Sequence, residues 1–473
     1  MKNLYFDYII ILAFSLFLST ELHAQQAMAP AGIQRDATHP TPEQVEYQRQ
    51  EKIAFVHFGV NTYTNREWGT GDESPSIFNP KKFDADQWAR VLSENGFQTL
   101  VLTAKHHDGF ALWPSDYTEH DVGSSPWKNG NGDIVKEVAE ACEKYGIKFG
   151  VYLSPWDMHE SSYGTPEYND FYLNQLEELL TNYGPIAEIW FDGAKGEGAK
   201  DMEYDFDAWW NMVRKLQPNA VIFSDEGPDV RWIGNEHGYA GETNWSTINR
   251  DSVSIGKPGQ GQYLNRGEPQ GPDWVPGECN TSIRPGWFYH QEEDDQVKPI
   301  SDLMEIYYKS IGRNCTMMIN IPPTPGGRFH ANDVERLNEF TERVEAIFDD
   351  NLAAGRSVTG SGSDHSALTD GEWDTFWVAD RGARSSTLTL TLAQPTRFNH
   401  IVLQEYIPLG QRIAEFKVLA KEENQWTQIT EGTTIGHKRI LKVEPVMTDQ
   451  VRIVIEKSYG QAALNEIGIY NGE

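Results

Sequence analysis

Cysteine and basic residues are scarce in this chain of 473 residues. Only Cys142, Cys279 and Cys315 are present. Three widely spaced cysteines form no disulfide framework and lack the paired spacing of a zinc site, so we expect buried free thiols. Lys and Arg number 40 against 70 Asp and Glu, which leaves a formal charge of −30. A protein this acidic repels phosphate backbones, and this excludes nucleic acid as an expected partner.

Long hydrophobic runs are also missing, apart from one near the start. The apolar run Ile9–Leu18 follows Lys2 and precedes the segment LHA at 22–24, the pattern of a cleavable signal peptide. The run is too short to span a bilayer well, and no cysteine follows that could carry a lipid anchor. We expect residues 1–24 to be removed and the protein to be exported to the periplasm or the medium, with no membrane span left. An uncleaved N-terminal anchor is the alternative.

Strand-like and helical stretches alternate between about residues 50 and 345. Such alternation over nearly 300 residues predicts a parallel sheet, and its length favours a closed (β/α)8, TIM-like barrel. We assign residues 25–350 to this catalytic domain. The predicted strands are Ile53–Phe58, Gln98–Ala104, Lys148–Leu153, Ile186–Asp192, Ala220–Ser224, Gly286–His290 and Thr316–Ile321, and the predicted helices are Asp84–Asn95, Asp133–Tyr145, Tyr168–Asn182, Asp207–Leu216, Ile300–Ser310 and 332–348.

The composition changes after about residue 350. The segment Ala353–His365 is rich in Gly and Ser and predicts a linker or a leading loop. Beyond it, short alternating runs without a long helix predict an all-β sandwich for residues 351–473. These runs are Ser386–Leu392, His400–Glu405, Glu415–Ala420, Gln425–Thr430, Arg439–Val443 and Val451–Ile455.

Several predicted barrel strands end in ionisable residues, where the active site of such a barrel lies. Asp192 is the strongest candidate, because it ends the apolar run 186–191 and precedes Gly193. A carboxylate at the end of a buried strand is costly unless it has partners or a task. We therefore interpret Asp192 as catalytic, with capping of the next helix as the alternative.

Histidines and a Glu–Trp pair follow the first two strands. His57 ends the first strand, Glu67 and Trp68 lie in the next loop, and His106 and His107 follow the second strand. The spacing of a zinc site is absent, so we expect no metal. Hydrogen bonding to sugar hydroxyls is the better functional interpretation, with ordinary loop histidines as the alternative. A Glu–Trp pair suits a pyranose, since it offers a carboxylate acceptor and a stacking face.

Glycoside hydrolysis commonly uses a pair of carboxyl groups, so Asp192 would need a second carboxyl group as its partner. Its pKa must be raised so that it is protonated in the resting enzyme. Glu236 lies beside Trp232 and Ile233, where desolvation could raise its pKa. Spacing alone does not decide between Glu236 and Glu278.

Eight motifs, in order along the barrel, resemble those of glycoside hydrolase family 29, the α-L-fucosidases. They are HFG (57–59), EWG (67–69), KHHDGF (105–110), GVYLSPWD (150–157), EIWFDGA (188–194), RWIGNE (231–236), SIRPGWFY (282–289) and NIPPTPGGR (320–328). The resemblance implies a retaining mechanism without a cofactor, with Asp192 as the nucleophile. It also implies sugar contacts from His57, Glu67, Trp68, His106, His107, Tyr152 and Trp287.

Two of these motifs resemble the branch of the family that acts on α-1,3/1,4-fucosyl linkages. In that branch the glutamate of RWIGNE is the acid/base, which implies Glu236, with Glu278 as the runner-up. The tail resembles a discoidin-like (F5/8 type C) module through LTDGEWDTFW at 368–377 and NEIGIYNG at 465–472. Such a module either binds glycans or only packs against the barrel.

The sequence thus predicts an exported, retaining exo-α-L-fucosidase acting on α-1,3/1,4-linked fucose of oligosaccharides or glycoconjugates. Its expected partners are fucosylated glycans. The alternatives are a broad-specificity α-L-fucosidase that also cleaves α-1,2 linkages, a non-catalytic fucose-binding protein, and a different exo-glycosidase such as an α-galactosidase. The natural glycan and the oligomeric state stay open.

Overall fold

The structure, a computed structural model, describes residues 37–472. The predicted signal peptide, residues 1–24, lies outside this range. The first described helix, α1 (Pro42–Gln50), was not expected from the sequence. It begins with a capping box in which the Thr41 hydroxyl accepts from the Gln44 backbone N–H and the Gln44 side chain accepts from the Thr41 N–H.

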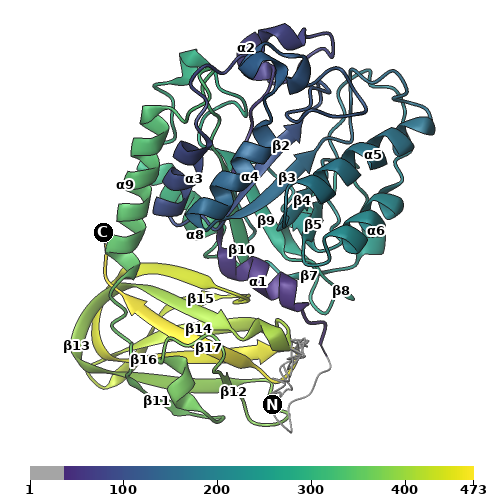
Figure 1. The fold of residues 1–473 in the computed structure, drawn as a ribbon. Coiled ribbons are helices and arrows are strands. Elements are labelled where there is room, and N and C mark those ends of the chain that lie inside the picture. Colours follow the sequence, from purple (N-terminus) through teal and green to yellow (C-terminus); the bar gives the residue numbers. More distant parts are fainter. Residues whose placement is uncertain (1–36, 473) are drawn as a thin grey trace, which may run out of the picture. The chain divides into compact units, whose positions relative to one another are not determined.

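Eight parallel strands close into a barrel, which confirms the predicted fold (Figure 1). Around the barrel the order is β1-β10-β9-β6-β5-β4-β3-β2. Apolar and aromatic side chains such as Phe55, Trp190 and Met318 fill its interior. The strands are β1 (Lys52–Val56), β2 (Thr99–Lys105), β3 (Lys148–Leu153), β4 (Glu188–Trp190), β5 (Val221–Ser224), β6 (Val230–Trp232), β9 (Gly277–Ser282) and β10 (Cys315–Asn320).

One predicted strand is wrong and two barrel strands were missed. Residues 286–290 form an irregular loop, and the strand at this place in the barrel is β9, which ends four residues before Gly286. β9 reads GECNTS and β6 has only three residues, so neither presents an apolar run. The polar side chains of β9 are buried because the barrel interior supplies their hydrogen bonds, whereas the apolar WFY segment packs from a loop.

Helices surround the barrel strands (Figure 1). Asp84, Asp133 and Asp205 cap three of these helices by accepting a backbone N–H in the first turn. The main helices are α3 (Ala85–Glu94), α4 (Ile134–Tyr145), α5 (Glu167–Asn182), α6 (Phe206–Leu216), α8 (Ile300–Lys309) and α9 (Ala331–Phe348). Shorter elements lie in the loops: α2 (Asn61–Thr64), α7 (Gly261–Arg266), β7 (Thr247–Ile248) and β8 (Asp273–Trp274).

The rest of the chain forms the predicted all-β domain around its own hydrophobic core. The strands β13 (Ser386–Glu405) and β16 (Arg439–Ser458) are long and pair antiparallel with register shifts, so several short predicted runs are parts of single strands. The expected linker contains β11 (Ser357–Gly360), which pairs with β13. The remaining strands are β12 (Trp377–Val378), β14 (Ile413–Glu422), β15 (Gln425–Gly432) and β17 (Ala463–Tyr470).

Two further expectations concern the cysteines and the absence of a membrane-spanning helix after the signal peptide. All three cysteines are free and buried, as predicted. Within residues 37–472, none of the helices has the length and apolar character needed to cross a membrane.

Candidate active site

A pocket of about 580 Å³ opens at the carboxyl ends of the barrel strands. In a barrel of this type, chemistry is carried out at this end. The pocket collects side chains from the ends of β1 to β4 and from the loops after β5, β6 and β9. Of the sequence-predicted site residues, it is lined by His57, Glu67, Trp68, His106, His107, Tyr152, Asp192, Glu236 and Trp287.

Asp192 lies two residues beyond the end of β4, and both of its carboxylate oxygens are engaged. Oδ1 accepts from the backbone N–H of Ala194 at 2.8 Å, and Oδ2 accepts from the Tyr152 hydroxyl at 2.9 Å. Nε2 of His107 is 3.8 Å from Oδ2. The next helix, α6, is capped by Asp205, which removes the alternative that Asp192 is a helix cap. Asp192 is thus held in the pocket with a fixed orientation.

Glu236 lies in the loop after β6, at the rim of the same pocket. Desolvation and then the negative charge of Asp192 raise the pKa of its carboxyl group, while a hydrogen bond from the Trp287 side chain and the nearby His237 oppose the shift. Glu236 is an exposed residue, so solvent limits the size of this effect. The direction is the one that a general acid requires.

The structure does not bring Glu278 to the pocket. It is the second residue of β9, four residues or about 13 Å below the carboxyl end of that strand. Its fully buried carboxyl group accepts from the Tyr47 hydroxyl at 2.6 Å and from the Trp190 indole N–H at 2.9 Å. Burial raises the pKa of Glu278 and of its neighbour Glu188. This pair lies in the barrel interior beneath the pocket floor.

Glu67 holds in place the wall of the pocket that Trp287 forms. Its carboxylate accepts from the backbone N–H groups of Trp287 and Phe288, at 2.7 and 3.2 Å, and lies 2.6 Å from Nε2 of His290. The sequence did not indicate His290, because this contact joins segments 223 residues apart. Trp68 stands at the mouth, 48% exposed, where its ring can contact a ligand.

The three pocket histidines are buried and neutral. Burial lowers the pKa of His57 to about 3 and that of His107 to about 4, and it lowers the pKa of His106 well below its usual value. Nδ1 of His57 is 2.8 Å from the Asn320 Oδ1 atom, and Nδ1 of His107 is 2.7 Å from the Ser154 hydroxyl. The rings can therefore contact a neutral polyol without adding positive charge beside Asp192.

Asp225, which directly follows β5, also lines the pocket. Burial, followed by the charges of Asp192 and Glu226, raises the pKa of Asp225 to about 6. Its carboxylate accepts from the Gly256 backbone N–H at 2.7 Å, which ties it to the loop that also carries Lys257. Sequence reasoning assigned no role to further lining residues, among them Phe55, Trp190, Lys257 and Asn280.

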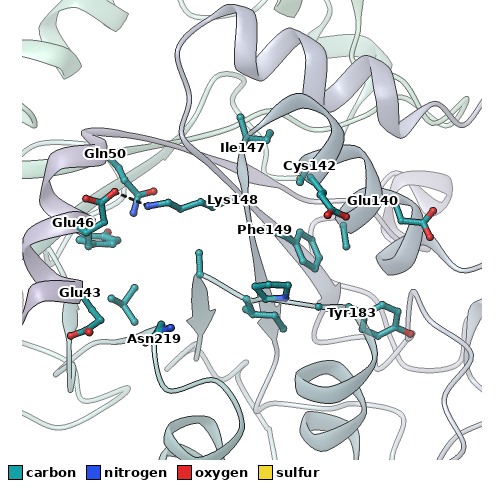
Figure 2. Close-up of a pocket in the computed structure, with 18 of the residues that line it drawn as sticks. Glu43, Glu46, Gln50, Glu140, Cys142, Ile147, Lys148, Phe149, Tyr183 and Asn219 are labelled. Atoms are coloured by element: carbon teal, nitrogen blue, oxygen red, sulfur yellow. Dashed lines mark hydrogen bonds and ion pairs between the residues drawn. The ribbon is translucent and has the colours of Figure 1, made fainter. Parts of the chain in front are cut away.

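Another hollow, of about 760 Å³, lies at the amino-terminal ends of β3 to β5 (Figure 2). Its wall includes Glu46 and Lys148, whose side chains form an ion pair at 2.9 Å, visible as a dashed line in Figure 2. None of the predicted site residues lines it. This end of a barrel serves stability rather than catalysis.

The tail motif at 368–377 makes contacts within its own domain and with α1. The Trp373 ring stacks on His437 with a centroid separation of 5.3 Å, and the Arg49 guanidinium of α1 lies 5.4 Å from its centre. Arg49 also pairs with Asp374 at 3.2 Å. The two Arg49 contacts show that this part of the module packs against α1.

Both domains of the chain match known protein families. The family model described as alpha-L-fucosidase matches residues 32–346, and the F5/8 type C domain model matches residues 352–467. The chain is 45% identical to alpha-L-fucosidase 1 of Arabidopsis thaliana, over 91% of this chain and 87% of the relative.

Solved structures share the fold over almost the whole chain. SpGH29 superposes with a TM-score of 0.89 at 41% identity, covering 92% of this chain and 99% of its own. A GH29 fucosidase of Ruminococcus gnavus, solved in complex with fucose, has a TM-score of 0.87 at 34% identity, covering 95% and 98%. The pocket brings four carboxyl groups and three buried histidines together, and this chain is a glycoside hydrolase that belongs to the α-L-fucosidase family, glycoside hydrolase family 29.

Proposed function

We propose that the protein is a retaining exo-α-L-fucosidase that hydrolyses terminal α-1,3- and α-1,4-linked fucose from oligosaccharides or glycoconjugates. The observation that carries the proposal is the single pocket in which Asp192 and Glu236 meet three neutral histidines. Fucose bound in the R. gnavus relative supports the choice of sugar.

In the proposed reaction Asp192 attacks the anomeric carbon of the fucosyl residue while Glu236 donates its proton to the leaving glycosidic oxygen. The glycosidic bond breaks and a fucosyl ester of Asp192 forms. Glu236, now ionised, takes a proton from water, which attacks the anomeric carbon and releases fucose and free Asp192. The Tyr152 hydroxyl and the Ala194 N–H fix the orientation of the nucleophile between the two steps.

The proposed linkage preference rests on the sequences of two segments, RWIGNE with Glu236 and SIRPGWFY with Trp287. Both residues lie on the rim where the leaving sugar must be accommodated, and the Trp287 side chain hydrogen bonds to Glu236. We also propose that the protein is exported, on the basis of the signal-peptide pattern in residues 1–24.

The test is fucose release from Lewis-type trisaccharides, 2′-fucosyllactose and the nitrophenyl α-L-fucoside, with the nitrophenyl α-D-galactoside as a control. Rapid cleavage of the Lewis sugars alone among the oligosaccharides is expected. Equal cleavage of 2′-fucosyllactose would favour a broad-specificity enzyme. NMR can identify the anomer of fucose that is released first. Release of β-fucose would show inversion of the anomeric configuration and would overturn the retaining mechanism.

A further inference from the structure

Asn320, the last residue of β10, links two walls of the pocket through one fully buried amide group. Its Nδ2 atom lies 2.8 Å from the backbone carbonyl oxygen of Trp287, which can only accept a hydrogen bond. Nδ2 also lies 2.9 Å from the Ser282 hydroxyl, which donates its own hydrogen to the carbonyl oxygen of Gly286 at 2.7 Å. Ser282 must therefore accept from Asn320, and both contacts identify the same atom as the amide nitrogen.

The direction of the contact with His57 follows from that assignment. Oδ1 of Asn320 is an acceptor, and it faces the His57 backbone N–H at 3.2 Å and the His57 Nδ1 atom at 2.8 Å. Nδ1 must then carry the hydrogen. In a neutral imidazole the other nitrogen, Nε2, is left with a lone pair.

His107 repeats this arrangement on the neighbouring strand. The Ser154 hydroxyl donates its hydrogen to the carbonyl oxygen of Trp156 at 2.5 Å and so accepts from His107 Nδ1, 2.7 Å away. Two of the three pocket histidines are thus held in the Nδ1–H form by groups behind them.

We propose that Asn320 is a positioning residue that holds His57 in its Nδ1–H form, so that Nε2 accepts a hydrogen bond from a sugar hydroxyl, while the same amide anchors the Trp287 wall. This rests on the proposed function, because the hydroxyl belongs to the bound fucose. A hydroxyl that must donate is not replaced by an ether, an ester or fluorine. The site therefore selects fucose whose contacted hydroxyl is free, and it rejects the O-methylated or O-acetylated sugar.

The groups around His57 fit a neutral acceptor. His106 and His107 approach from the end of β2, Tyr152 from β3 and Trp287 from the loop after β9, and the carboxylates of Glu67 and Asp192 line the same pocket. Burial lowers the pKa of His57 to about 3, with the Asn320 hydrogen bond opposing the shift and His107 adding to it. A carboxylate in place of the Asn320 amide would raise the pKa of His57 again, because an opposite charge at hydrogen-bond distance raises a histidine pKa by about 1–3 units.

The first experiment compares the pH dependence of kcat/KM for the wild type, Asn320→Asp and Asn320→Ala. In Asn320→Asp, His57 is protonated at low pH and both ring nitrogens donate, so the acceptor is lost. We expect kcat/KM to fall by about ten- to a hundredfold near pH 5 and to recover as the pH rises. Asn320→Ala removes the amide without adding charge, so its kcat/KM should be lower without this new pH dependence. Identical profiles for the two variants would overturn the inference.

The second experiment needs neither turnover nor a variant of Asn320. In 15N-histidine-labelled wild type, with the His57 signals assigned by comparison with His57→Gln, NMR should find Nδ1 protonated and Nε2 unprotonated at neutral pH. A proton on Nε2 would overturn the inference. Failure of the wild type to cleave any fucoside would count against the proposed function, whereas the NMR result tests the hydrogen-bond assignment separately.

Discussion

Replacement of Glu236 and of Glu278 by Gln separates the two carboxyls that the sequence could not distinguish. Loss of a general acid/base typically costs 10²- to 10⁴-fold in rate, or about 3–5 kcal/mol of transition-state free energy. We expect Glu236→Gln to lower kcat/KM by that factor for Lewis-type trisaccharides. The loss should be smaller for a dinitrophenyl fucoside, because its leaving group departs without protonation.

Glu278→Gln should affect stability instead of chemistry. The carboxylate accepts from both the Tyr47 hydroxyl and the Trp190 N–H, and the amide of Gln has only one acceptor atom. One buried donor then loses its partner, which costs about 1–3 kcal/mol of unfolding free energy. We expect kcat/KM to change by less than about tenfold and the melting temperature to fall by a few degrees.

The assay is steady-state kinetics on both substrates, together with thermal unfolding followed by circular dichroism. The matched substitution at the two positions controls for the loss of one carboxylate. Our reasoning is refuted if folded Glu278→Gln loses as much activity as Glu236→Gln, or if Glu236→Gln cleaves the trisaccharides at the wild-type rate.

Three further predictions concern the nucleophile, the pH profile and metals. Asp192→Asn should lower kcat by at least about a thousandfold and abolish covalent labelling by a 2-deoxy-2-fluoro-fucosyl donor in mass spectrometry, and an adduct on another residue would contradict the assignment. The raised pKa of Glu236 means that kcat/KM should fall as the pH rises through that pKa and the acid loses its proton, and this limb should vanish in Glu236→Gln. Dialysis against EDTA should leave the rate unchanged, because the proposed reaction needs only the carboxyl groups of Asp192 and Glu236.

Much of the barrel and of the site could be predicted from local sequence. Strand–helix alternation requires no knowledge of distant contacts, and the carboxyl ends of parallel strands meet at one rim. Asp192, His57, His106 and His107 lie at or just after such strand ends, so the place of each in its strand was enough to bring them together. The strand β9 was missed because it has no apolar pattern. Its buried polar side chains form hydrogen bonds across the barrel instead.

The sequence by itself determined the barrel, the nucleophile candidate Asp192 and the cluster of His57, His106 and His107, because these depend on patterns within single strands and loops. Only the tertiary structure separated Glu236 from Glu278, since β6 and β9 pair so that Trp232 lies opposite Glu278, which leaves Glu278 within the strand and Glu236 on the loop above it. Only the tertiary structure showed that Asn320 fixes His57 and that Glu67 holds the Trp287 loop, at separations of 263 and 220 residues. Such roles depend on which donors and acceptors meet across the barrel, and closure of the sheet, rather than neighbouring sequence, decides that.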